Sequence, residues 1–372
     1  MLHLPHKIIK SRGNFFLLGL VTILLVGCSS ESVKRAEFVL AYPPPPDTAR
    51  FYFERTIRSS FDVKEITGAD KLKIFATGTL GTAQGLGKPY GIAVRKGRIY
   101  VTDTVKRAVL MFDVPGKDFK VIGTEGPGAL SKPIGIDITK DGEIFVADNS
   151  AKRIVVFNED GEFLRAFGNR SILKRPSGVA VSPDGKRAYV IDTGGVTTQE
   201  HHLFIFNAKT GELEKTIGTR GRKDGDFNLA LQITVADDGT VYVTDSGNFR
   251  VQAFNPDGSH KMSFGTVGRK IGNFARPKGI ATDPDGNIYV VDSAFGNFQI
   301  FNDKSILLMF IGQRGRTPAP GQYMLPAGIS VDEDGRIYIV DQFFRKIDIY
   351  RPAHLEKNDG YLGGEHLRKA NS

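Results

Sequence analysis

The 372-residue sequence has one cysteine, Cys28, so it offers no pair of thiols for a disulfide or a redox site. It contains no nucleophile motif and no glycine-rich loop of the kind that cradles phosphate groups, and its glycines occur at turns. The enzyme classes that such motifs mark are therefore not indicated. We predict no catalytic residue and no cofactor.

Apolar runs long enough to cross a membrane are lacking at the N-terminus. The run from about Phe15 to Val26 has twelve residues, which are too few to span a bilayer comfortably. It follows a basic stretch made of Lys7, Lys10 and Arg12. A basic stretch before a short apolar run is typical of an export signal.

The run ends in Leu25-Val26-Gly27-Cys28, which resembles the bacterial lipobox. The resemblance implies a signal peptide over 1–27 and an acylated Cys28, which would anchor the protein stably because it carries several acyl chains. An ordinary signal peptide with a chance cysteine is the alternative. Ser29 favours the outer membrane over the inner one in a Gram-negative host. Residues 28–48 would then form the lipidated N-terminus and a tether stiffened by Pro43 to Pro46.

The excess of basic over acidic residues is also small. The sequence has 50 Lys and Arg against 41 Asp and Glu, and loss of 1–27 removes three basic residues, which leaves a net charge of +6. Mild basicity outside the cytoplasm indicates an acidic protein, an anionic envelope polymer or phosphate groups as partners, and no nucleic acid.

A repeated phrase is the main feature that the sequence does contain. A β-branched run that ends in Asp occurs six times, at spacings of 44 to 53 residues, with its Asp at Asp103, Asp148, Asp192, Asp245, Asp292 and Asp341. A turn of the Asp-Gly or Lys-Gly type precedes each run, and such turns between apolar strands indicate hairpins. Each unit reads as four antiparallel strands, so the fold class is all-β, a six-bladed β-propeller.

The stretch GNFARPKGIATDPDGNIYVVD, at residues 272–292, resembles the NHL repeat, and the resemblance covers roughly Gly78 to Arg351. It implies a propeller over 49–352, with ligands bound by the loops that join the second strand to the third and each blade to the next. Residues 353–372 show no strand pattern and are predicted to be a flexible tail.

Closure of the ring needs one more strand, because the sixth repeat stops after three. We favour residues 49–57 (ARFYFERTI), which alternate strongly, over residues 72–76 (LKIFA). The second segment also fits a short capped helix that begins near Asp70.

Four residues in the loops between second and third strands are candidates for binding: Arg153, His202, Arg250 and Lys346. Each stands five residues after the signature Asp or, in blade three, at the matching position past an insertion. The alternative for Arg153 and Arg250 is that each braces its own loop.

Histidines do not form an obvious zinc site. The blade-three insertion brings Glu200, His201 and His202 together, but adjacent residues of a strand point to opposite faces. A catalytic zinc needs three protein ligands. The peptidyl-hydroxyglycine lyases, which are similar propellers, collect histidines from several blades, and that set is missing here. We therefore predict no bound metal and exposed side chains for His201 and His202.

Small residues in the innermost strands are expected to let six strands crowd the axis, and Asp137 and Gln232 depart from this pattern. Either could line a polar channel. A single carboxylate is a poor calcium site, since calcium takes six to eight oxygens.

The loops before blades four, five and six read GTRGR, GTVGR and GQRGR, which places Arg222, Arg269 and Arg316 at matching positions. We call these three residues the basic arc. With Phe343 and Phe344 they are candidates for binding an acidic or aromatic-rich partner. The favoured function is a lipid-anchored extracytoplasmic scaffold that binds a protein or an envelope ligand. The alternative is a lactonase-like or lyase-like enzyme that uses Asp137, Gln232 and His202.

Overall fold

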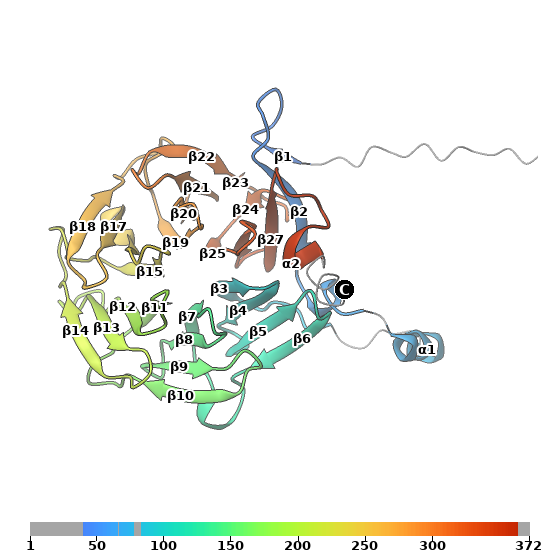
Figure 1. Cartoon of the computed structure of the whole chain (residues 1–372), viewed down its shortest axis with the longest axis horizontal. Coiled ribbons are helices and arrows are strands. Elements are labelled where there is room, and N and C mark those ends of the chain that lie inside the picture. The colour runs from blue at the N-terminus through green and yellow to red at the C-terminus, as the bar shows by residue number, and fades with distance from the viewer. Residues whose placement is uncertain (1–39, 66, 78–82, 364–372) are drawn as a thin grey trace, which may run out of the picture. The chain divides into compact units, whose positions relative to one another are not determined.

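The computed structural model describes residues 40–65, 67–77 and 83–363. Six four-stranded antiparallel units are arranged radially around one axis, as the sequence predicted (Figure 1). In five blades the strands follow the chain from the axis outward: β3 (Pro89–Arg95), β4 (Arg98–Asp103), β5 (Ala108–Asp113) and β6 (Asp118–Ile122); β7 (Pro133–Ile138), β8 (Ile144–Asp148), β9 (Arg153–Phe157) and β10 (Phe163–Phe167); β11 (Pro176–Val181), β12 (Arg187–Asp192), β13 (His202–Asn207) and β14 (Leu213–Ile217); β15 (Ala230–Val235), β16 (Val241–Asp245), β17 (Arg250–Phe254) and β18 (His260–Phe264); and β19 (Pro277–Thr282), β20 (Ile288–Asp292), β21 (Asn297–Phe301) and β22 (Leu307–Ile311).

Blade six takes three strands from the C-terminal end of the chain and its outer strand from the N-terminal end. The order is β25 (Pro326–Val331), β26 (Ile337–Asp341), β27 (Lys346–Pro352) and β2 (Phe51–Ile57), with the two-residue β1 (Ala41–Tyr42) outside β2. β2 pairs antiparallel with β27 through a bulge at Glu54. The closing strand is therefore the one favoured from the sequence. The other segment lies in the helix α1 (Gly68–Thr77).

Two expectations about the ends of the propeller were wrong. Pro43 to Pro46 do not form a tether spacer but the loop between β1 and β2, because β1 is held by backbone bonds from Arg50 and Phe53. The chain after Pro352 is ordered at least to Gly363: the short helix α2 (Gly360–Gly363) buries Leu362 in the core of blades one and six. In the described part of the chain, no helix is long and apolar enough to cross a membrane.

The innermost strands approach one another so closely that several of their positions require glycine. A Cβ at Gly91 would lie 2.4 Å from the Ile134 carbonyl oxygen, and one at Gly328 would lie 2.4 Å from that of Tyr90. Real Cβ atoms do not approach backbone at such distances. The small residues thus have the packing role that the sequence indicated, while the apolar core lies between the blades, as in the cluster that joins Tyr189 to Val243.

The signature aspartates fix the loops. All six are at most 1% exposed, and each accepts a hydrogen bond from a backbone N–H of the interblade loop that leads into its own blade. Five of them also accept N–H groups of the loop that follows the second strand. In blade four the second set of donors is side chains, including Arg250.

The closing strand is also held by buried polar contacts. The guanidinium of Arg336 on the hairpin before β26 is fully buried and bonds Glu54 at 2.8 Å, Asp334 at 2.9 Å and the Asp359 carbonyl oxygen at 2.8 Å. Thr56 on β2 donates to Asp348 on β27 at 2.7 Å. These contacts connect the N-terminal strand with the C-terminal segment.

We predict that Glu54→Gln destabilises the protein by about 3 kcal/mol, because it leaves the buried charge of Arg336 with less compensation while Asp334 still faces it. Urea unfolding of the variant would measure this loss. Glu214→Gln, which breaks an ion pair with Arg187 at the surface, is the matched control and should cost less than about 1 kcal/mol. Equal losses in the two variants would contradict the buried role of the Glu54 pair.

Candidate functional site

The propeller has two different ends because its strands are antiparallel. The interblade loops and the loops from second to third strands lie at one end, which we call the interblade face. The hairpins that join first to second and third to fourth strands lie at the other, the hairpin face. The sequence placed the basic arc on the interblade face and the channel residues at the axis.

Three consecutive interblade loops share one pattern of backbone pairing, although the third loop is two residues longer. Gly221, Gly268 and Gly315 donate their N–H groups to the carbonyl oxygens of Phe227, Phe274 and Tyr323, at 3.0 to 3.1 Å. The residues just before these glycines pair in parallel with the same aromatics, and in the last loop this pairing forms β23 (Gln313–Arg314) and β24 (Gln322–Tyr323). The three aromatics are fully buried, as expected for a structural wedge.

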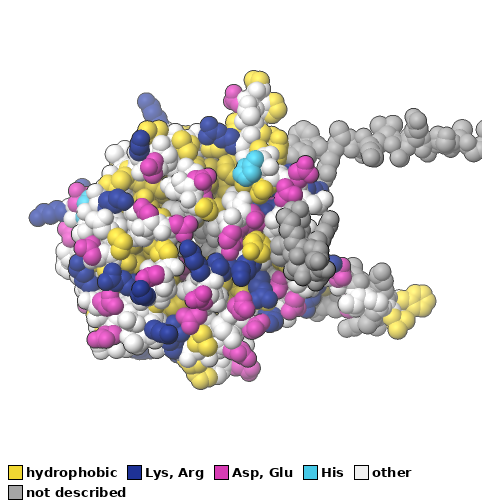
Figure 2. Space-filling model, in the orientation of Figure 1, with side chains coloured by type: hydrophobic (Ala, Val, Ile, Leu, Met, Phe, Trp, Pro, Cys, Tyr) yellow, Lys and Arg dark blue, Asp and Glu magenta, His cyan; other side chains and the backbone are white. Residues whose placement is uncertain are grey.

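The arc residues follow these glycines directly, so the shared backbone places them at equivalent points of three blades. Arg222, Arg269 and Arg316 are exposed, and within the described residues none of their guanidinium groups forms a hydrogen bond or an ion pair. Residues 218–227, 265–274 and 312–323 together hold seven basic side chains against two acidic ones, Asp224 and Asp226. Figure 2 shows one face of the propeller, and on that face basic and acidic side chains are interspersed.

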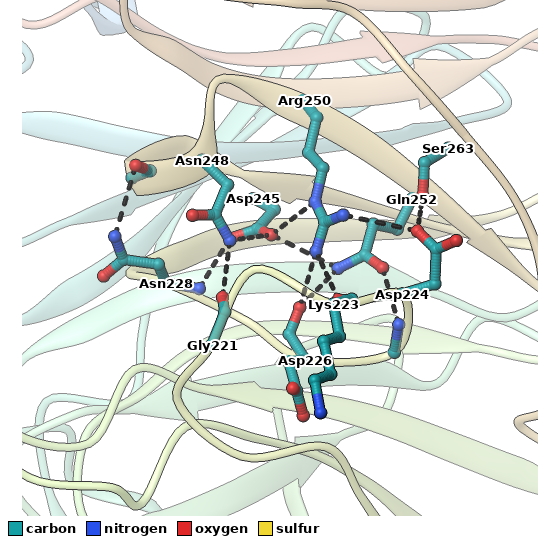
Figure 3. Close-up of polar contacts among 12 residues, drawn as sticks. Gly221, Lys223, Asp224, Asp226, Asn228, Asp245, Asn248, Arg250, Gln252 and Ser263 are labelled. Atoms are coloured by element: carbon teal, nitrogen blue, oxygen red, sulfur yellow. Dashed lines mark hydrogen bonds and ion pairs between the residues drawn. The ribbon is translucent and has the colours of Figure 1, made fainter.

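Arg250 belongs to the scaffold of its loop. Its Nε donates to Asp245 at 2.9 Å, and its terminal nitrogens reach Asp224 and the carbonyl oxygens of Lys223 and Asp226 (Figure 3). Gln252 and Asn248 bond the same carboxylate. All three nitrogens of its guanidinium are bonded to groups of its own loop and of the interblade loop, so it braces these loops.

Arg153 has a similar role in blade two, where it donates to the carbonyl oxygens of Pro127 and Ala129. Lys346 does not fit the prediction of a binding residue. Its side chain is fully buried, with Nζ bonded to Asp348 at 2.6 Å and to the Ala319 carbonyl oxygen at 2.7 Å. Asp348 lies two residues further along the same strand and hence on the same face, which draws the ammonium inward.

Phe343 is 57% exposed, and Phe344, which packs edge-to-face against it, is half-buried. Both lie in the loop after β26, on the interblade face. They remain available to a partner on the same end of the propeller as the arc.

The histidines of blade three differ from each other. His201 is fully buried, which corrects the expectation that it is exposed: its Nε2 contacts the Gly195 carbonyl oxygen, and its Nδ1 accepts the Leu229 N–H at 3.1 Å. Burial lowers the pKa of this imidazole. His202 is half-buried and bonds the Gly218 carbonyl oxygen. Thus both imidazoles hold backbone of the insertion and the loop into blade four.

No group of three or more His, Cys, Asp or Glu side chains arranged to hold a metal ion occurs among the described residues. Cys28, the predicted site of lipidation, lies outside them.

A cavity of about 280 Å³ lies at the axis and is lined on the hairpin side by the ends of the innermost strands. Asp137 lines it and accepts N–H groups from Val181 and Ile138, at 2.8 and 2.9 Å. Burial raises the pKa of Asp137 to about 6, and these two hydrogen bonds oppose the rise. Gln232 lines the same cavity and donates to the Ser177 carbonyl oxygen, which ties two inner strands together.

Sequence reasoning missed four further carboxyl residues that line this cavity: Asp237, Asp283, Asp332 and Glu333. Asp332 is 3% exposed, bonds the Tyr338 hydroxyl at 2.6 Å and accepts the Arg336 N–H. Burial raises its pKa to about 7. The only signal in the sequence was its place directly after the inner strand of blade six, where Asp283 stands in blade five.

Comparison with known proteins supports the repeat assignment. The sequence model of the NHL repeat matches residues 130–157, 227–254 and 274–301, which lie in blades two, four and five. NHL repeat-containing protein 3 of Homo sapiens is 28% identical over 151 residues, or 37% of this chain and 39% of that protein. Protein lin-41 of Caenorhabditis elegans is 32% identical over 99 residues, or 27% of this chain and 8% of that protein. The chain therefore matches well under half the length of these relatives.

Solved structures show the same fold at low identity. A Bacteroides thetaiotaomicron protein of unknown function has a TM-score of 0.57 at 17% identity, covering 80% of this chain and 76% of its own. A streptogramin B lyase has a TM-score of 0.51 at 16% identity, with 72% and 94% covered. Virginiamycin B lyase from Staphylococcus aureus has a TM-score of 0.50 at 14% identity, with 71% and 95% covered. At such identities the likeness establishes the propeller fold alone.

We predict that Asp137→Asn changes how stability depends on pH. The pKa of Asp137 is about 6 in the folded protein against a usual value of 3.8, so between these values the folded state binds more protons than the unfolded state. Its contribution to stability must therefore fall as the pH rises from about 4 to about 6. Urea unfolding of both proteins should show the variant gaining stability relative to the wild type over that interval. A difference that does not vary with pH would contradict the raised pKa.

Proposed function

We propose that this protein is a lipid-anchored, extracytoplasmic NHL propeller whose interblade face binds an acidic surface of a partner in the cell envelope. The basic arc is the observation that carries the proposal. Its three arginines occupy equivalent points on loops that share one pattern of backbone pairing, whereas Arg153 and Arg250 form hydrogen bonds within the protein. The lipobox-like segment that ends at Cys28 supports the anchor.

The loops suit such binding because they are ordered before a partner arrives. A buried aromatic, a parallel backbone pair and a signature aspartate hold each of them. Little conformational entropy is then lost on docking. Arginine in addition offers a planar fork that bonds carboxylate or phosphate groups bidentately, which lysine cannot do.

An enzymatic function has less support. Its three candidate residues do not share a site in the described part of the chain, since Asp137 and Gln232 line the axial cavity and His202 does not. The imidazole of His202 also bonds a backbone carbonyl. The structural similarity to a streptogramin B lyase is at 16% sequence identity, so it concerns the fold alone and does not support a lyase activity.

The anchor is tested by Cys28→Ala. We expect the variant to lose acylation and to move from the membrane fraction to the soluble envelope fraction, because Cys28 is the only thiol of the chain. Radiolabelled palmitate and fractionation of cells would measure both. A variant that stays acylated and membrane-bound would contradict the lipid anchor.

The binding face is tested by replacing Arg222, Arg269 and Arg316 with Ala together. Each lost contact should cost about 1–3 kcal/mol if the partner group becomes buried, and less than about 1 kcal/mol at an exposed rim. Crosslinking and pull-down from envelope extracts at several salt concentrations would measure the loss of partners.

A control with the same change of net charge replaces Lys140, Lys186 and Lys209 with Ala, because these exposed residues lie in turns of the hairpin face. Equal recovery of partners by both triple variants would place binding elsewhere.

A further inference from the structure

The outermost strand of blade five, β22, exposes apolar side chains at positions where blades three and four carry polar ones. Ile306, Leu308 and Phe310 are 57%, 39% and 47% exposed. They alternate with Leu307, Met309 and Ile311, which are more buried. We call Ile306, Leu308 and Phe310 the rim strip.

Matching positions can be compared because blades two to five all have a bulge at the same point of the outer strand. The bulge residue is Leu164, Glu214, Lys261 and Leu308 in blades two, three, four and five. Two residues further on stand Ala166, Thr216, Ser263 and Phe310, and two residues earlier stand Glu162, Glu212, Ser259 and Ile306. Blades three and four are polar at all three positions, and blade five is apolar at all three. The outer strand therefore also forms with polar side chains at these positions, so the fold does not require the rim strip.

The rim strip lies beside the place where the N-terminal segment joins the propeller. Met309 of β22 packs against the same apolar cluster as Tyr42 of β1 and Phe53 of β2. Figure 1 shows β22, β23 and β1 next to one another along the rim.

Eleven residues, 29–39, separate Cys28 from Leu40, where the described chain begins. Such a segment spans at most about 40 Å when fully extended, and roughly 20 Å on average if flexible. An anchor at Cys28 would therefore keep this side of the rim close to the bilayer, where even a weak contact has a high effective concentration.

Charges at both ends of the strip suit the same neighbour. Lys304 precedes it, next to Asp303, and Arg314 follows it, all exposed. Apolar side chains flanked by basic ones are typical of surfaces that lie at the interface of an anionic bilayer. The bulge at Leu308 at the same time disrupts the edge for pairing with another strand, which disfavours addition of a strand from a second molecule.

We propose that the rim strip rests on the membrane surface, so that blade five docks into the lipid interface with its propeller axis roughly parallel to the bilayer. This inference rests on the proposed lipid anchor at Cys28 for its orientation. It adds that the interblade face, with the basic arc, then opens sideways into the envelope and stays accessible to a partner.

The absence of tryptophan from the sequence makes a direct test possible. Two single-tryptophan variants of the mature chain are compared: Phe310→Trp in the rim strip and Thr216→Trp at the matching position of blade three. Each is coupled through the Cys28 thiol to a maleimide phospholipid in vesicles of phosphatidylethanolamine and phosphatidylglycerol (3:1) that contain brominated lipid. Coupling supplies the anchor chemically, so this test does not depend on whether cells acylate Cys28.

We expect brominated lipid to quench the tryptophan at position 310 several-fold more than the one at position 216. Adding Ile306→Ser and Leu308→Lys, which introduces the residue types that blade four carries at these two positions, should lower quenching at position 310 to the level at position 216. Melting curves would show that the variants fold.

Equal quenching at the two positions would overturn the proposal, and so would quenching at position 310 that persists after the two substitutions. Self-association of the wild-type chain that the same substitutions abolish, without lipid quenching, would also overturn it and identify the strip as a protein contact. Failure of the Cys28→Ala test in cells, in contrast, would concern the anchor alone.

Discussion

A buried carboxylate at the end of the second strand organises every blade of this propeller. It accepts N–H groups from the loop that enters the blade, and in five blades also from the backbone of the loop that follows the strand. Because these hydrogen bonds are partly buried, loss of the carboxylate would leave several N–H groups without their partner at once. The geometry of the interblade face, including the equal positions of the three arc arginines, depends on this interaction. In blade four Arg250 adds a compensating charge to it.

Periodicity explains why the fold could be predicted from the sequence. The repeated aspartates, turns and small residues recur at regular spacing, and residues 51–57 alternate as an outer strand should. The C-terminal segment could not be predicted, since its structure depends on partners far away in the sequence, such as Arg50 for Ala353. The proline run could not be predicted either, since its structure depends on the pairing of the two-residue β1 with β2. Proline composition alone indicates a spacer and carries no information about such a partner.

The candidate site was predicted in part for the same reason. The bracing role considered for Arg250 follows from its spacing to Asp245 within one repeat, and the structure confirms it. Lys346 and His201 are buried because of what surrounds them in single blades, and no repeat pattern carries that information. A spacing of two residues between Lys346 and Asp348 was the one available signal, since it places opposite charges on one face of a strand. Raised pKa values of Asp137 and Asp332 likewise arise from burial at the axis, which only the folded ring creates.

Joining the first strand to the last repeat has a consequence for the order of folding. Thr56 meets Asp348 across 292 residues of sequence, so during synthesis the edge of β2 that pairs with β27 has no partner until nearly the whole chain has been made. Contacts between residues so distant form late, because the entropy of closing the long loop must be overcome first. Blades one to five can assemble from neighbouring segments, and throughout that time β2 can pair only with the two-residue β1. Pairing of β2 with β27 is therefore the step that closes the ring. Until then the unpaired strand edges of blade six are exposed, and such edges favour aggregation.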